Sequence, residues 1–355
     1  MLLSLIGGDL AGIARLAMLI AGIAALAPMQ SAAAQDLGAA IRKANAYIEV
    51  ARSTERAVES WERYASWVSM KTGPTGRERY ISYGMYDLHD YVRSVLREAR
   101  DAANRQPSTP KLDALMQRYM DAYELLEPVM NRASAYYDRK GYKADGMAEG
   151  RALHVALVPL AEAFLAEREA MLRELRVFAR EVEWLEIAAV EAREGRTLWW
   201  QAAHVVHAAR RVFDVFPRER PTPIGADAFE EQLKAIGPDT PGEKLDELIA
   251  GVERPKGVVI EVARLEAATK QYADAVAIFD RFATEKPDYL KDFRRHKALP
   301  RQLLEGLRAL QAALVRSQGR DFEGSGPLVN RVIQDYFALQ NAASPVAPRQ
   351  LRYLE

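Results

Sequence analysis

The sequence has no cysteine among its 355 residues, only five histidines, and equal numbers of basic and acidic side chains, 49 of each. The absence of cysteine excludes disulfides, a Cys-type zinc site, a thiol nucleophile and a thiolate-held iron–sulfur cluster. It also excludes a lipid-modified N-terminal cysteine, so we expect no lipid anchor. A formal charge of zero argues against a general nucleic-acid binder. The hydrophobic fraction of 49% is large enough to form a folded core.

The N-terminus has the pattern of a secretory signal peptide. Arg15 precedes an uncharged stretch, Leu16 to Met29, and small residues follow it up to Ala34. A short apolar run after a positive charge, closed by an Ala-x-Ala site, is typical of an export signal. We therefore expect cleavage after Ala34 and a periplasmic protein with no transmembrane span after cleavage. An uncleaved N-terminal membrane anchor is the alternative, since counting from Ala11 lengthens the apolar run.

The mature chain, residues 35–355, is predicted to be all-α, a single domain built as an extended bundle of long antiparallel helices. Apolar residues recur at three- and four-residue steps, and no alternating strand pattern of useful length is present. A Pro- and Gly-rich excursion is expected around residues 217–255. The helices are predicted over about 41–68, 81–104, 111–135, 164–195, 197–216, 258–286, 298–317 and 327–341. Pro128 is expected to kink or split the third of these.

The predicted central helix has the spacing of a coiled-coil seam. Its seam positions alternate by four and three residues from Phe164 through Leu175 to Leu185 and Ala189, and seven of eight are apolar. Gly195 is expected to end this helix.

A tyrosine-rich corner lies before the central helix, with the sequence YYDRKGYKADGMAEGRALH from Tyr136 to His154. Gly141 suits the end of one helix, and Asp145 suits the N-cap of the next. The tyrosine rings can pack over the turn, so the corner is either a helix–helix junction or a binding site. As a binding site it would use the following residues: Tyr136, Tyr137, Asp138, Tyr142, Lys143, Asp145 and His154.

These corner residues, together with Gly150 and the opening segment 43–49 (KANAYIE), resemble the YiiG-like family of bacterial exported proteins. The resemblance implies an exported domain of unknown function and brings no established activity. Many members of that family look like lipoproteins. This chain departs from them because it has no cysteine.

Two histidines, His204 and His207, lie three residues apart and can share one helix face, as metal ligands often do. A metal centre needs further ligands, and the nearest acidic residues in the sequence are Glu194 and Asp214. Half-buried structural histidines are the other interpretation.

Large aromatic residues are grouped at Trp61, Tyr64 and Trp67, and again at Trp199-Trp200. Because Trp61 and Trp67 cannot both face one direction in a helix, one of them is expected to be partly exposed. An exposed tryptophan would be typical of a binding surface, whereas core packing is the alternative.

No phosphate-binding loop, Gly-x-Ser-x-Gly or His-Glu-x-x-His motif occurs, and we expect no cofactor. The leading hypothesis is a non-enzymatic exported protein of the bacterial cell envelope, which binds an unidentified envelope protein or small ligand along a groove of the bundle. The alternative is a metal-binding or enzymatic bundle that uses His204 and His207 with neighbouring carboxylates.

Overall fold

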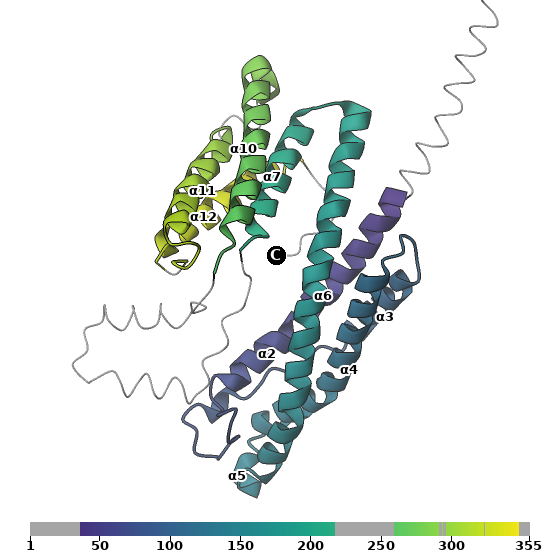
Figure 1. Cartoon of the computed structure of the whole chain (residues 1–355). Helices are drawn as coiled ribbons and strands as arrows, with labels where there is room; N and C mark the ends of the chain where they lie inside the picture. The colour runs from purple at the N-terminus through teal and green to yellow at the C-terminus, as the bar shows by residue number, and fades with distance from the viewer. Residues whose placement is uncertain (1–35, 217–258, 291–292, 294–295, 323, 348–355) are drawn as a thin grey trace, which may run out of the picture.

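The computed structural model describes residues 36–216, 259–290, 293, 296–322 and 324–347 (Figure 1). The predicted signal peptide and the whole of the predicted 217–255 excursion lie outside these residues. Most of the described residues are helical and none forms a β-strand, which confirms the all-α prediction. None of the described helices is both long enough and apolar enough to cross a bilayer.

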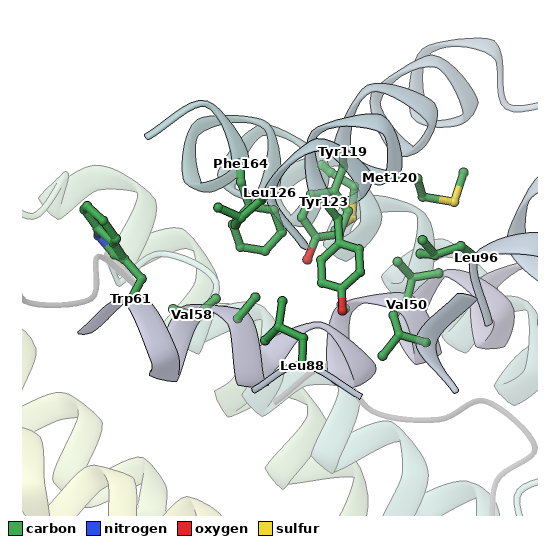
Figure 2. Packing of buried hydrophobic residues seen from close by; sticks show 14 of the residues in the cluster. Val50, Val58, Trp61, Leu88, Leu96, Tyr119, Met120, Tyr123, Leu126 and Phe164 are labelled. Carbon is green, nitrogen blue, oxygen red and sulfur yellow. The ribbon is translucent and has the colours of Figure 1, made fainter. Parts of the chain in front are cut away.

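The first half of the chain forms a helical body around α4 and α6. Its elements are a helix over residues 36–53, α2 (Glu55–Ala65), a 3₁₀ turn (Ile81–Tyr83), α3 (Val92–Ala103), α4 (Pro110–Asp138), the short α5 (Tyr142–Asp145) and α6 (Ala148–Glu194). The helix over 36–53 and α2 lie across α4 and α6, and their aliphatic and aromatic side chains meet in the core (Figure 2). Tyr119 of α4 stacks on Phe164 of α6 there, with ring centroids 5.3 Å apart.

The second half of the chain packs against the far end of α6. It consists of α7 (Leu198–Phe213), α10 (Val262–Glu285), a 3₁₀ turn (Pro287–Leu290), α11 (Leu299–Arg316) and α12 (Gly326–Ala343). Its buried apolar residues form a cluster separate from the first, and the division on α6 falls between Val182 and Ile187. One helix of 47 residues, about 70 Å long, therefore belongs to both cores.

The first predicted helix, over 41–68, is divided in the structure. The helical run stops at Thr54, α2 begins at Glu55, and α2 ends at Ala65. Arg168 of α6 stabilises the break, because its Nη2 donates to the carbonyl oxygen of Ala51 at 3.2 Å and also to Glu55. Its partners lie more than a hundred residues away in the chain, so no local pattern could show this break.

The segment 84–91 is not helical, although the sequence predicts a helix from about Ile81. Side chains of other elements bind its backbone instead. Ser60 Oγ donates to the carbonyl of Tyr86 and accepts from its amide, and Asn131 Oδ1 accepts from the amide of Leu88. These partners satisfy backbone groups that a helix would otherwise pair, so the chain stays extended along α2 until α3 begins.

Of the two outcomes expected for Pro128, a kink or a split, the split does not occur, because α4 continues through it. Pro159 likewise lies inside α6. Both prolines are exposed, so each ring stands on the solvent side of its helix and displaces no core side chain. Gly195 ends α6 as expected, with a φ of 75° that favours glycine.

Candidate functional site

The tyrosine corner is held by Asp145, which caps α6. Its carboxylate accepts hydrogen bonds from the amides of Met147 and Glu149, both at 2.9 Å, and from the Tyr136 hydroxyl at 2.9 Å. The Glu149 amide, together with Tyr136 and Met147, lowers the pKa of Asp145. The predicted N-cap position is wrong, because Met147 is the N-cap of α6 and Asp145 ends α5. The Asp145 carboxylate nevertheless binds the amide of Glu149 in the first turn of α6, which is the contact that an N-cap residue makes.

The aromatic side of the corner is part of the core. Tyr137 packs edge-on against Trp67, with ring centroids 5.0 Å apart, and lies 6.1 Å from Tyr64. The Tyr64 hydroxyl lies 3.0 Å from Nδ1 of His154, which is buried. Burial lowers the pKa of His154, against the effect of its hydrogen bond to the Met70 backbone. The neutral imidazole is therefore the form that this core holds.

The remaining corner residues do not converge with these. Asp138 and Lys143 are exposed, and Tyr142 is half-buried. The structure thus brings together Tyr136 with Asp145, and Tyr137 with His154 through Tyr64. This geometry is that of a packed junction between α4 and α6, and the corner's role in binding stays a prediction.

The two histidines of α7 lie at its interface with α6. Nδ1 of His207 is 2.9 Å from Glu183 Oε2, and the same carboxylate accepts a hydrogen bond from Arg210. Burial and the charges of nearby arginines, Arg180 foremost, lower the pKa of His207 to about 3. A neutral His207 must donate from Nδ1 to the carboxylate, which leaves its lone pair on Nε2.

His204 is stacked on Trp200 with ring centroids 4.6 Å apart, and Trp184 of α6 lies 5.9 Å away. Burial, followed by the neighbouring His207, lowers the pKa of His204 to about 4. Its Nδ1 has no hydrogen-bond partner within the described part of the chain.

The described residues contain no group of three or more His, Asp or Glu side chains that could hold a metal ion. Glu183 is the carboxylate at His207, and it is occupied by Arg210 and Arg180. Arg180 also pairs with Asp214 at 2.8 Å, so two arginines and two carboxylates form a charge-balanced helix–helix contact. The metal and enzymatic alternative gains no support from these side chains.

The expectation of an exposed tryptophan at 61 or 67 is wrong, because both side chains are buried. Trp67 lies beyond the end of α2, so it does not follow the helical rotation on which the expectation depended. Its Nε1 donates to the carbonyl of Gly84 at 2.9 Å.

A surface that the sequence did not single out lies where α2 meets the segment 80–86. We call it the Arg/Tyr surface, and it consists of Arg56, Arg63, Tyr80, Tyr83 and Tyr86. The guanidinium of Arg63 lies over the rings of Tyr83 and Tyr86, at 5.4 and 4.5 Å from their centroids, and Arg56 lies over Tyr86 at 4.9 Å. Tyr80 stacks on Tyr83, with ring centroids 5.1 Å apart.

The Arg/Tyr surface borders an open hollow of about 670 Å³, which Glu59, Glu62 and Ser66 also line. Tyr80 and Tyr83 are 37% and 49% exposed, which is high for aromatic side chains. Tyrosine recurs at every third position in the sequence YISYGMY, and this spacing is the sequence signal that could have identified the surface.

The architecture defines the chain as a two-core helical bundle protein in which a single long helix is shared. A family model described as "Protein of unknown function (DUF3829)" matches residues 39–277, and the chain therefore belongs to this uncharacterised family. The match covers the first core, α7 and part of α10, whereas α11 and α12 lie beyond it. Comparison with curated proteins and with solved structures gave no match.

Proposed function

We propose that this chain is an exported, non-enzymatic binding protein of the bacterial cell envelope, and that it contacts a protein partner through the Arg/Tyr surface. The exposure of Tyr80 and Tyr83 beside two arginines is the observation that carries the proposal. Tyrosine and arginine are the residue types enriched at the centres of protein interfaces, where each combines a large contact area with hydrogen-bonding groups.

The Arg/Tyr surface is already ordered, which favours binding. Arg63 donates from Nε to the carbonyl of Tyr83 at 2.6 Å and from Nη1 to the hydroxyl of Tyr86 at 2.9 Å. Arg56 donates to the carbonyl and the carboxylate of Asp87 at 2.6 and 2.8 Å. Because these side chains are held before a partner arrives, less conformational entropy is lost when it binds.

The experiment is a pull-down from the envelope fraction with the mature chain, residues 35–355, as bait. Three baits are compared: the unchanged chain, the double variant Tyr80→Ala/Tyr83→Ala, and Tyr91→Ala. Tyr91 is 55% exposed and lies outside the Arg/Tyr surface, so it is the matched control.

We expect a reproducible partner that the unchanged chain and Tyr91→Ala retain and the double variant loses. A partner that the double variant still retains would move the binding site elsewhere. The absence of any shared partner across replicates would remove the interaction proposal.

Export has its own test, because the leader-like pattern around Arg15 and Ala34 is its support. We expect the full-length chain, expressed in a bacterium, to be recovered from the periplasm with a mature N-terminus at Gln35, as read by mass spectrometry. Recovery in the membrane fraction with residues 1–34 intact would favour the N-terminal anchor instead.

A further inference from the structure

A second hollow, separate from the Arg/Tyr surface, lies between the helix over 36–53 and α3. Its volume is about 410 Å³. The charged side chains on its wall are Arg42 and Glu49 from the first helix, and Glu98 and Arg105 from α3 and the turn after it. Between them the floor is formed by small apolar side chains: Ala39, Ala46, Val95 and Ala102. We call this hollow the charged cleft.

The two walls of the charged cleft run in opposite directions. Nζ of Lys43 reaches the carbonyls of Ala103 and Pro107, at 3.4 and 2.8 Å, so the start of the first helix lies beside the end of α3. Seven residues further along the first helix, Val50 lies beside Leu96 in the core (Figure 2).

This antiparallel arrangement sorts the charges of the cleft by sign. Arg42 and Arg105 lie at the end marked by Lys43, and Glu49 and Glu98 lie at the end marked by Val50. On each wall the two charges are seven residues apart, Arg42 and Glu49 on the first helix, and Glu98 and Arg105 on α3 and the turn after it. At 1.5 Å per residue, the positive and negative ends of the cleft are separated by about 10 Å along the helix axis.

The positive end is not neutralised by its own surroundings. Neither Arg42 nor Arg105, nor Glu98 at the other end, forms an ion pair with any residue that the structure describes. Lys43 also lines the cleft, but it already forms an ion pair, because its ammonium lies 3.0 Å from Asp113 Oδ1. Two arginine side chains therefore line this end of the cleft without a described counter-ion.

We propose that the charged cleft binds a short, extended peptide with free termini. The peptide carboxylate lies between Arg42 and Arg105, and its ammonium group lies between Glu49 and Glu98. A guanidinium pair suits a carboxylate because it offers several donors in a planar geometry. A fully extended peptide of three residues spans about 10 Å, which matches the separation of the two ends.

The floor and the remaining lining fit the same ligand. The alanine and valine side chains leave room for small side chains on the peptide, and the amide groups of Asn45 and Gln106 border the cleft within reach of peptide bonds. The proposal is independent of the Arg/Tyr surface, so either site can be disproved while the other stands.

The test uses trialanine as the probe and isothermal titration calorimetry on the mature chain. Three forms of the peptide are compared: free, N-acetylated and C-amidated. Two variants remove one charge at each end, Arg105→Gln and Glu98→Gln, and Arg97→Gln on the exposed face of α3 is the matched control. All of these positions are exposed, and circular dichroism verifies that each variant is folded.

We expect saturable binding of free trialanine and a loss of about tenfold or more in affinity on acetylation or amidation. Glu98→Gln should weaken the binding of the free peptide and leave the affinity for the acetylated peptide unchanged. Arg105→Gln should weaken the binding of the free peptide and leave the affinity for the amidated peptide unchanged. Arg97→Gln should bind as the unchanged chain does.

Three results would overturn the proposal. The first is the absence of saturable trialanine binding. The second is affinity that is unaffected by either end modification. The third is sensitivity to amidation alone, which would describe a simple anion site rather than a site for a zwitterion.

Discussion

Gly141 shows how tightly the tyrosine corner is packed. A Cβ atom at this position would lie 2.6 Å from Cδ2 of Tyr136, which real side chains do not tolerate. The backbone there is in the ordinary right-handed region, with a φ of −52°, which any residue can adopt. Glycine is therefore required because of the nearby Tyr136 ring, and not because of the backbone conformation. Gly141 is therefore a sensitive position at which to test whether the corner is a packed junction.

We expect Gly141→Ala to lower the free energy of unfolding by about 1–3 kcal/mol, because the Tyr136 ring must move away from the new methyl group. Gly38→Ala is the control, since its Cβ would meet only Arg42 Nη1 at 3.4 Å and it lies within a helix. That change should raise stability by about 0.5 kcal/mol. Urea denaturation of both variants measures the difference, and equal effects would show that the corner is loosely packed.

His207 makes stability depend on pH. In the folded chain its pKa is lowered to about 3 from the ordinary value of 6.5. Between these values the unfolded chain binds a proton that the folded chain does not, so falling pH favours unfolding. This loss of folding free energy is absent above about pH 7 and grows by about 1 kcal/mol per pH unit below pH 6.

The measurement is the free energy of unfolding from pH 7 to pH 4 for the unchanged chain and for His207→Gln. We expect a shallower decline in the variant, because the amide cannot titrate. His89→Gln is the control, since that side chain is exposed, and it should follow the unchanged chain. A variant whose decline parallels that of the unchanged chain would contradict the role given to His207.

The sequence predicted individual residues well only where both partners are close in the chain. Gly195 as a helix end depends on neighbours within a few positions and is confirmed. Asp145 binds the Glu149 amide at the start of α6, as a nearby partner can, although Met147 is the N-cap. His204 and His207 share one face of α7, as predicted, but the carboxylate at His207 comes from Glu183 on another helix. The Arg/Tyr surface was missed for the same reason, since only the fold brings α2 against the segment 80–86.

At the scale of elements, Arg168 joins α6 to the break between the first helix and α2. Its side chain is buried, and it supplies donors to the Ala51 carbonyl and to Glu55, on either side of the interruption at Thr54. Removing the guanidinium would take away one of the two side-chain donors to the buried Ala51 carbonyl, the other being Thr54 Oγ1 at 3.3 Å, and would break the ion pair with Glu55.

We expect Arg168→Met to lower the free energy of unfolding by about 2–4 kcal/mol, because the variant loses a charge-assisted hydrogen bond to a buried carbonyl and a partly buried ion pair. Arg173→Met on the same helix is the control. That arginine is exposed and pairs only with Glu169 within its own turn, so its loss should change stability by less than about 0.5 kcal/mol. Equal losses for the two variants would show that Arg168 does not stabilise the break.

Helix boundaries could be read from the sequence where glycine or proline ends a helix, as at Gly195 and Pro287. They could not be read where side chains from elsewhere take over the backbone hydrogen bonds. The segment 84–91 has a helical pattern, yet Ser60 and Asn131 hold its amides and carbonyls in an extended form. Such competition between partners is decided by tertiary contacts, which periodicity does not record.

At the scale of the whole molecule, the seam predicted along α6 rotates out of the core. A spacing of 3.5 residues drifts by about 20° per heptad against a helix of 3.6 residues per turn. Phe164 and Leu175 are buried, but Leu185, three heptads after Phe164, is 52% exposed, and Glu183 and Ile187 take the inner face instead. The rotation lets one helix present one face to the first core and another to the second.

Because the two cores share only one helix, a substitution in one core should destabilise that core more than the other. Phe164 belongs to the first cluster and Phe279 to the second, and both are fully buried (Figure 1 shows α10, which carries Phe279, packed on α7). Replacement of either phenylalanine by alanine should cost about 3–5 kcal/mol in its own core. Because buried residues of the two clusters do not join, the loss should not spread equally to the other.

Hydrogen–deuterium exchange followed by mass spectrometry can locate the loss. In Phe279→Ala we expect faster exchange in α7, α10 and α11, with protection retained in α4 and in α6 up to Val182. In Phe164→Ala the pattern should reverse, and the end of α6 after Ile187 should keep its protection because α7 still covers it. If either substitution instead opened both halves to the same extent, α6 would couple the cores into one cooperative unit, as the sequence's single-domain prediction implies.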